Sequence, residues 1–588
     1  MIFAVAFRHW WVANKSMKRI HEENNGFGRS HVLPDHFKVL FQLISAGLVT
    51  IILLYSSFLR TGPSYPLIPR DYFAQHFKSQ SVHGNISASV QNVIEALRNA
   101  TPRAAENSSQ IVIDPAWSEK NPCRSRAELT GFYSERRYAK NLGENLEWEA
   151  VMSEYEKLHH ACIQKIGNAT SYFLSKNNSS ACKFVIAHSN LGLGNKILTT
   201  VSTFMYAIMT QRVMLISSKT FIPDIMCEPF YQSSWRLPED FPMPDQSPDL
   251  WSSEDSIFSH IERTTKDKVV SSTGLYAVKS GETYAAPSSR LFCSTELNQA
   301  DDIPWVLLAG CMYFLPRLFS VPHFRPALEA LFPDYMVLTH VLRSIMLPAD
   351  PIWARVLSAR KAYLQGADRM VGIQVRYREG YDHYTSTRSE IEARIQQCTI
   401  ENGLLPIPDR RGWAWSSSRL PMATCAPTIK VFVASLFPSF HDRLHETYIQ
   451  YPTIGGENVA VIQLSFNQYQ SVHLEEDKKA LMEMLLLSYA DDLIVTPTST
   501  FGGVAQAYGA LIPWFINFNT ENRTEAPNCL RGQTVDVCYQ KGPEIYHCPH
   551  DPDTNGKSIT SEVPYIQRCL TIDGYKDIKG GIQLITSN

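Results

Sequence analysis

"YADDLIVTPTSTFGGVAQAYG" spans residues 489–509. It begins with a short apolar run, Leu493–Val495, then passes through hydroxyl side chains and two glycines into a helical pattern. A strand that leads directly into a helix is typical of parallel sheets, which bind ligands at the carboxyl ends of their strands. Hydroxyls and exposed backbone at such a point indicate a site for an anionic group.

Similar strand–helix units occur in two separate series. The first has a strand at 184–187, a glycine turn at 191–195, a helix at 197–209 and a strand at 213–216. The second has strands at 370–376, 429–435, 458–464, 492–496 and 511–516, with helices near 439–449, 475–490 and 503–509. Two series predict an α/β fold with two Rossmann-type lobes that face a cleft.

The bulk composition limits the classes of partner. The chain has 588 residues, which is too many for one ordinary core, so two domains with extensions are expected. Its net charge of -2 gives no argument for a nucleic-acid partner.

The N-terminal region predicts a membrane anchor. Residues 39–59 carry no charged side chain and are long enough to cross a bilayer as a helix. Six Lys and Arg precede them, which favours a cytoplasmic tail over 1–38 and a lumenal remainder. A cleaved signal peptide is the alternative, but a 38-residue lead-in is long for one. We therefore expect a single-pass type II protein.

The rest of the chain agrees with a lumenal location. Residues 60–120 are polar and are predicted to form a stem, followed by lobes at 121–355 and 356–525 and a disulfide-rich extension at 526–588. All twelve cysteines lie beyond the predicted anchor, which predicts structural disulfides of undetermined pairing. N-glycosylation triplets, which are modified only in the secretory lumen, begin at Asn85, Asn99, Asn107, Asn168, Asn177, Asn178 and Asn522.

Three features are candidates for phosphate binding, and each also has an ordinary structural explanation. Arg376 ends an apolar strand and has the fixed charged fork that matches phosphate oxygens, or it forms a salt bridge within its loop. Ser499 and Thr500 either cap the next helix or donate to a diphosphate. Gly192 and Gly194 either make a tight turn or admit a ligand to the backbone.

Metal and phosphate-loop motifs are missing from the sequence. It contains no C-x-x-C, no H-E-x-x-H and no G-x-x-x-x-G-K-[ST]. We therefore expect no obligatory metal or other cofactor, and a lumenal sulfotransferase is disfavoured.

Six stretches in matching order resemble the plant cell-wall fucosyltransferases of the xyloglucan type, glycosyltransferase family 37. They are "GLGNKILT" (192–199), "MCEPFYQSSWRLPEDFP" (226–242), "IPWVLLAGCMYFLPRLF" (303–319), "VGIQVR" (371–376), "VFVASLFPSF" (431–440) and "LLLSYADDLIVTPTSTFGGVAQAYG" (485–509).

The resemblance implies a Golgi enzyme with a GT-B-like variant of two Rossmann-type lobes. It implies inverting transfer of L-fucose from GDP-β-L-fucose to the 2-hydroxyl of a galactose, in a xyloglucan-like polysaccharide or a glycoprotein glycan. By motif match, Arg376 is the catalytic arginine that holds the diphosphate. The remaining donor contacts are Ser435, Ser499, Thr500, Phe501 and Gly502, and Gly192, Gly194 and Asn195 form an acceptor-side segment or a turn.

The chain departs from the family pattern at three places. Lys196 stands where arginine is usual, Gly503 stands where tyrosine is typical, and Ala309–Met312 lacks the polar residues of that segment. A catalytically degenerate glycan-binding or scaffolding protein is therefore the alternative. The general base is open among His188, Asp302, Glu379 and His383, and so are the acceptor and any association with itself or with other Golgi glycosyltransferases.

Overall fold

The computed structural model describes residues 86–586 with gaps, the longest at 103–121, 135–141, 244–274, 281–290, 378–385, 412–425, 466–472, 519–526 and 571–580. All described residues belong to one compact unit, Gly84–Asn588. The predicted anchor at 39–59 lies outside them. Within the described residues, no helix combines the length and apolarity needed to cross a membrane.

The first sheet confirms the predicted parallel α/β arrangement in the first half of the chain. Its strand order is β3-β2-β1-β5-β4 and every neighbouring pair is parallel. Sequence analysis identified β1 and β2 but not the other three strands. The strands are β1 (Phe184–His188), β2 (Val213–Ser217), β3 (Arg236–Leu237), β4 (Leu275–Ser280) and β5 (Trp305–Gly310).

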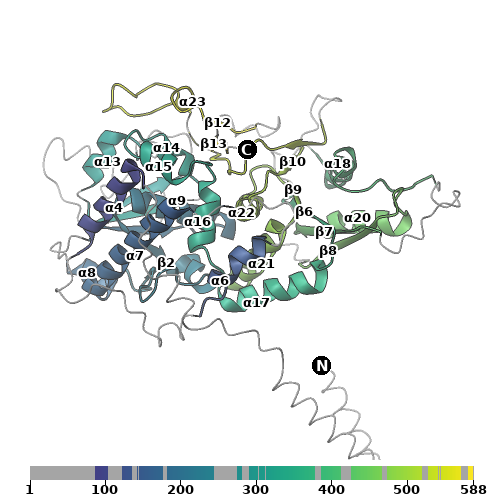
Figure 1. The fold of residues 1–588 in the computed structure, drawn as a ribbon, viewed down its shortest axis with the longest axis horizontal. Helices are drawn as coiled ribbons and strands as arrows, with labels where there is room; N and C mark the ends of the chain where they lie inside the picture. Colours follow the sequence, from purple (N-terminus) through teal and green to yellow (C-terminus); the bar gives the residue numbers. More distant parts are fainter. Residues whose placement is uncertain are drawn as a thin grey trace, which may run out of the picture. The chain divides into compact units, whose positions relative to one another are not determined.

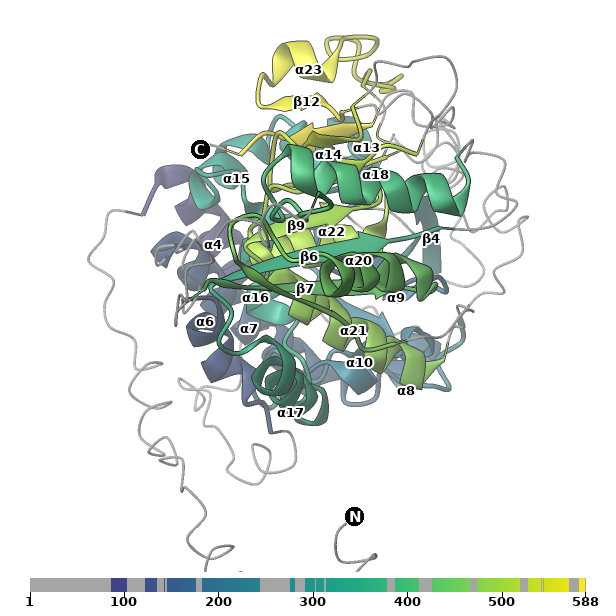
Figure 2. The same cartoon turned by 90° about the vertical axis from the view of Figure 1, so that its right-hand side faces the viewer.

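The second sheet contains all the strands predicted in the second series. Its order is β11-β10-β9-β6-β7-β8, parallel except for the β10–β11 pair. Figure 2 shows β6, β7 and β9 side by side with α18 and α20 outside them. The strands are β6 (Arg369–Val375), β7 (Thr428–Ser435), β8 (Asn458–Gln463), β9 (Asp492–Val495), β10 (Trp514–Ile516) and β11 (Cys529–Arg531).

Alternate residues of the second sheet enter different apolar cores, as the period of a strand requires. Phe432, Leu493 and Val495 join the large core that also contains the first sheet. Val433 and Ile494 join a smaller core on the other face, together with residues of α18 and α20. The helices here are α18 (Arg388–Glu401), α20 (Ser439–Gln450), α21 (Leu474–Ser488) and α22 (Thr500–Gly509).

Helices from both halves of the chain pack together. α9 (Leu193–Met209) and α16 (Val337–Ile345) both contact α22, and α22 also contacts α21 (Figure 1). α9 is buried almost all round, with only Asn195 half-buried. The predicted turn at 191–195 is too long, because Gly192 caps a helix that already begins at Leu193.

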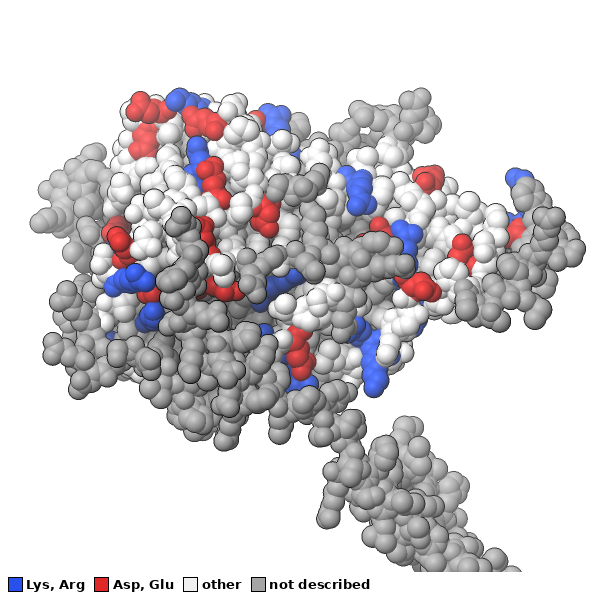
Figure 3. Space-filling view, in the orientation of Figure 1, with Lys and Arg blue, Asp and Glu red and all other residues white. Residues whose placement is uncertain are grey.

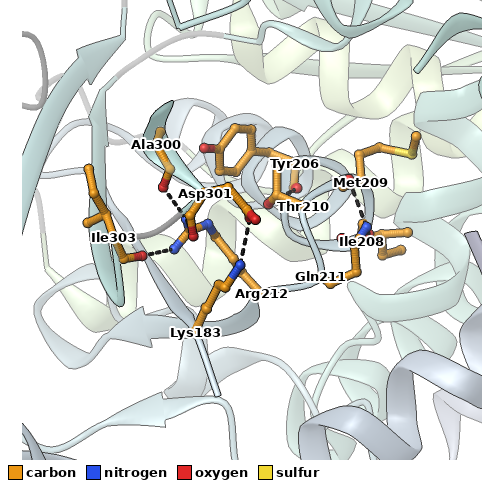
Figure 4. A network of polar contacts seen from close by, with 10 residues as sticks. All are labelled: Lys183, Tyr206, Ile208, Met209, Thr210, Gln211, Arg212, Ala300, Asp301 and Ile303. Carbon is orange, nitrogen blue, oxygen red and sulfur yellow. Dashed lines mark hydrogen bonds and ion pairs between the residues drawn. The ribbon is translucent and has the colours of Figure 1, made fainter. Parts of the chain in front are cut away.

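A buried arginine fastens the end of the first strand–helix–strand unit (Figure 4). Arg212 is 1% exposed and donates to the carbonyl oxygens of Ile303 at 2.6 Å and Ala300 at 2.7 Å. Lys183 pairs with Asp301 at 2.7 Å. These contacts connect the segment before β5 to the starts of β1 and β2. The role of Arg212 is therefore structural.

The prediction that 60–120 forms a polar stem is wrong for residues 88–100. They form helix α4 (Ala88–Ala100), which buries Val90, Val93, Ile94 and Leu97. These apolar residues repeat at helical spacing, and the surrounding polar side chains obscured that pattern. α4 packs on α7 (Leu146–Ile166) and on α15 (Arg325–Leu331).

The remaining helices of the described residues are shorter segments. They are α6 (Ser125–Ser134), α8 (Ala169–Leu174), η1 (Ser218–Thr220), α10 (Ile222–Ile225), α13 (Ser294–Ala300), α14 (Leu315–Phe319), α17 (Asp350–Ala359), η3 (Arg360–Leu364) and α23 (Ile559–Glu562).

The C-terminal segment is anchored to both halves of the chain. It contains the antiparallel pair β12 (Ile566–Arg568) and β13 (Ile582–Leu584). Tyr313 donates a hydrogen bond to Asp536, and Tyr546 donates to the carbonyl of Ser320 at 2.9 Å. Disulfides are present as predicted, and the described pairs are Cys123–Cys227, Cys162–Cys182, Cys293–Cys548, Cys398–Cys529 and Cys538–Cys569.

Candidate functional site

The carboxyl ends of β6 and β9 bring the predicted arginine, Arg376, beside residues 496–500, which we call the hydroxyl loop. The two strands are parallel neighbours, with Gln374 paired to Val495. The backbone N–H of Arg376 donates to Oγ1 of Thr496 at 2.8 Å. The guanidinium-bearing residue and the loop therefore lie at one edge of one sheet.

The hydroxyl loop bends sharply into α22. Thr498 has a positive φ of 63°, which turns the chain away from the strand direction. Ser499 caps the helix, with its Oγ accepting from the N–H of Gly502 at 3.5 Å. The helix begins at Thr500 and not at 503 as predicted, so Thr500, Phe501 and Gly502 supply its first N–H groups. Such groups attract anions.

Glycines allow this helix start to approach two other elements closely. A Cβ on Gly194 would lie 2.7 Å from the carbonyl carbon of Thr500, and one on Gly502 would lie 2.8 Å from Oε1 of Gln374. The first contact joins the first turn of helix α9 to the start of α22. Gly192 and Asn195 stand beside it, with the N–H of Asn195 donating to the Gly192 carbonyl at 2.9 Å.

Ser435 lies at the carboxyl end of β7, paired across the ladder with Val375. Its Oγ accepts from the N–H of Phe437 at 3.2 Å, and its carbonyl accepts from the amide of Gln463 at 3.0 Å. Arg376 follows β6, Ser435 ends β7 and the start of α22 follows β9, and these three strands are neighbours in the order β9-β6-β7. This is the set of residues that sequence analysis selected.

Two buried polar residues at this edge were missed. Oε1 of Gln374, 3% exposed, has no hydrogen-bond partner within the described residues. Burial raises the pKa of Glu483 on α21 to about 7, and its Oε1 also has no partner there. A polar residue inside an apolar strand or helix was the available signal for both. Satisfying such groups is a common role of ligands or water.

Lys196 has a structural partner. Its Nζ lies 2.6 Å from Oδ2 of Asp477, and both side chains are almost completely buried. The ring of Phe221 lies 4.9 Å from the same ammonium. The pair joins α9 to α21, so this charge holds two helices together.

The structure describes only some of the other predicted residues. His188 ends β1, is 3% exposed and is paired in the ladder with Ala309 of β5. Asp302, Glu379, His383 and Cys311–Met312 lie outside the described residues. Among the predicted glycosylation sites, Asn99 and Asn168 are exposed, and the others lie outside the described residues.

Charged groups near the site do not form a metal centre within the described residues. The one group with metal-like spacing there is Cys293, Cys548 and Asp551, and its two cysteines form a disulfide. On the face shown in Figure 3, acidic and basic side chains are interspersed over the described surface.

Two mainly parallel sheets define an α/β protein, and its glycine- and hydroxyl-rich helix start offers N–H and hydroxyl groups of the kind that can bind an anion. Comparisons with known proteins agree. A family model described as "Xyloglucan fucosyltransferase" matches residues 92–549.

Individual relatives cover most of the chain. A galactoside 2-alpha-L-fucosyltransferase of Arabidopsis thaliana is 31% identical, over 74% of this chain and 76% of its own. One of Pisum sativum is 30% identical, over 73% of each chain. The solved structure of a point mutant of Arabidopsis thaliana FUT1 in complex with GDP has a TM-score of 0.66 at 28% identity, covering 80% of this chain and 98% of its own.

The chain belongs to the xyloglucan fucosyltransferase family. The resemblance found in its six motifs is thereby confirmed.

Proposed function

We propose that this protein transfers L-fucose from GDP-β-L-fucose to the 2-hydroxyl of a galactose, with inversion, in a xyloglucan-like polysaccharide or a glycoprotein glycan. The observation that carries the proposal is the hydrogen bond of 2.8 Å from the backbone N–H of Arg376 to Oγ1 of Thr496, in the segment that leads from β9 into the hydroxyl- and glycine-rich start of α22. The relatives named as galactoside 2-alpha-L-fucosyltransferases support the same activity.

The chemistry follows from the charge that develops during transfer. As the anomeric bond breaks, negative charge accumulates on the GDP leaving group. Arg376 and the N–H groups of Thr500 and Phe501 stabilise that charge in this proposal, with the hydroxyls of Ser435 and Ser499 as further donors. This charge neutralisation requires no metal ion.

Architecture and location complete the proposal. The two parallel sheets correspond to a GT-B-like pair of lobes. The uncharged stretch at 39–59 would anchor the enzyme in the Golgi membrane with its catalytic part in the lumen, and the five disulfides are compatible with that oxidising compartment.

The test is incubation of purified protein with GDP-fucose and a panel of galactose-ended oligosaccharides, with the linkage of each product determined. We expect fucose on the 2-hydroxyl of galactose in at least one acceptor. GDP binding without transfer to any galactoside would overturn the proposal.

A further inference from the structure

Residues 496–499 form a β-turn between β9 and α22, which we call the 496–499 turn. The N–H of Ser499 donates to the carbonyl of Thr496 at 3.2 Å, which closes the turn. Pro497 occupies its second position, and Thr498 occupies its third with a φ of 63°. A proline at the second position and a positive φ at the third are the marks of a type II turn, whose third position favours glycine.

Threonine is an unfavourable residue at this position. Positive φ is uncommon outside glycine, and for a β-branched side chain it is an outlier. Among the described residues, Thr498 is the only β-branched residue with a positive φ. Such a conformation persists only where the surrounding structure holds it. The contacts of Thr498 with the rest of the protein therefore decide whether the turn forms.

The C-terminal segment supplies a contact that holds the turn. Nε2 of Gln540 donates to the carbonyl of Thr498 at 2.6 Å. That carbonyl and the N–H of Ser499 belong to one peptide group, which is thus bonded to Thr496 within the turn and to Gln540 from outside it. Opening the turn loses both hydrogen bonds. The bond from Gln540 therefore offsets part of the cost of the positive φ.

Gln540 is attached to a fixed part of the structure. The preceding residue, Tyr539, exchanges two backbone hydrogen bonds with Ile582 of β13, at 2.8 and 3.2 Å. Cys538 forms a disulfide with Cys569. The backbone that carries Gln540 is thus held independently of the turn, so its side chain can act as a support for the turn.

The same segment also packs on α22 itself. Nε2 of Gln506 donates to the carbonyls of Val535 at 2.9 Å and Asp536 at 3.0 Å. A Cβ on Gly503 would lie 3.1 Å from the side chain of Val537. Gly503 stands where the family pattern has tyrosine, and in this chain the C-terminal segment occupies the space beside it.

The 496–499 turn connects the two parts of the proposed donor site. Its first residue, Thr496, accepts the N–H of Arg376 at 2.8 Å, and its last residue, Ser499, caps α22. A change in the turn moves the helix start relative to Arg376. Holding a diphosphate requires both at once, so the turn sets the geometry of the site.

We infer that Gln540 is a positioning residue for the proposed donor site. By holding the carbonyl of Thr498, it keeps the 496–499 turn and the start of α22 in the arrangement that binds the diphosphate. Gln540 acts through the turn and contacts no substrate in this inference. The inference rests on the proposed function and adds that donor binding depends on the C-terminal segment.

The test is a double-mutant cycle in the full-length protein. Gln540→Met removes the hydrogen bond at nearly constant side-chain length, and Thr498→Gly removes the cost of the positive φ. The matched control is Gln567→Met, the same substitution at an exposed position of β12 in the same segment. Calorimetry gives the Kd for GDP of the wild type, each variant and the double variant, well below their melting temperatures. Turnover of GDP-fucose is measured beside it.

With threonine at 498, we expect Gln540→Met to raise the Kd for GDP about tenfold, because losing the hydrogen bond lowers the fraction of molecules with the turn formed. With glycine at 498, the turn forms without outside support, so the same substitution should raise the Kd less than about threefold. Equal increases in the two backgrounds would overturn the inference. So would an increase with threonine no larger than that caused by Gln567→Met.

A purely structural role of Gln540 gives a different result. The melting temperature then falls while the Kd for GDP of the folded protein stays unchanged, which also overturns the inference. If Gln540→Met does not fold, Gln540→Asn, one methylene shorter, takes its place in the cycle with the same expected ratios. Wild-type protein that binds GDP but transfers no fucose refutes the proposed function and leaves the cycle decisive. Wild-type protein that binds no GDP overturns both.

Discussion

Gly194 lies directly against the backbone of Thr500, so the first turn of helix α9 touches the start of helix α22. A Cβ at Gly194 would lie 2.7 Å from the Thr500 carbonyl carbon and 2.8 Å from its Oγ1. The two glycine-containing motifs, 306 residues apart in the sequence (500 minus 194), therefore meet at one point. This contact fixes the position of α9 relative to the predicted donor loop.

Substitution of Gly194 by alanine should separate these elements. The added methyl group meets backbone, which cannot move aside cheaply, so we expect a loss of roughly 1–3 kcal/mol in stability and weaker GDP binding. Urea denaturation and calorimetry measure the two effects. Gly131→Ala is the matched control, because nothing lies within 4 Å of its Cβ position. Equal behaviour of the two variants would contradict the close packing at Thr500.

Arg376→Ala should lower the turnover of GDP-fucose by roughly 10²–10³, because one donor to the developing charge is lost. Arg369→Gln is the control at the opposite end of the same strand, where the side chain pairs with Asp492 at 2.6 Å. It should affect turnover little. Near-normal turnover in folded Arg376→Ala protein would remove this residue from the donor site.

The buried Lys196–Asp477 pair predicts a non-additive mutant cycle. Lys196→Met leaves Asp477 buried without its partner and should cost roughly 3–5 kcal/mol, whereas the double variant with Asp477→Leu should recover most of that loss. The urea midpoints of the wild type, both single variants and the double variant measure the cycle. Additive losses would show that the two side chains do not interact in solution.

Stability should fall as pH rises from about 4 to 7. Burial raises the pKa of Asp536 to about 7 from its ordinary 3.8, so the folded state keeps a proton that the unfolded chain has already released. Unfolding then releases a proton in this window, and the stabilisation lost across it is on the order of 4 kcal/mol. Asp536→Asn should flatten the profile of unfolding free energy against pH. A slope unchanged by this substitution would assign the effect to another group, of which Glu483 is the foremost, since burial raises its pKa to about 7 as well.

Chelation should leave the proposed transferase active. Because Arg376 and the helix-start N–H groups neutralise the diphosphate in our proposal, EDTA in excess is expected to change turnover less than twofold. A loss of activity that Mn²⁺ or Mg²⁺ restores would show that a cation shares this role.

The local pattern of the chain was sufficient to predict most of the second sheet. Apolar runs such as 370–376 and 429–435 are long, uninterrupted and followed by helical periodicity, so burial on both faces is their only stable arrangement. The same reasoning placed Arg376 and Ser499 at strand ends, because strand ends are visible in sequence. It failed at α4, where four apolar residues are hidden in a polar stretch and become buried only in the tertiary structure, in which α4 contacts α7, α15 and α9.

The sequence by itself determined the class of fold, the family and the chemical character of the predicted donor loop, since these depend on residue types at short spacing. Only the tertiary structure decided that Gly194 packs against Thr500, that Lys196 forms an ion pair with Asp477, and that the C-terminal segment lines a pocket beside Ser499. Each of these contacts joins residues far apart in the chain, and local periodicity contains no information about which distant surfaces will exclude water together.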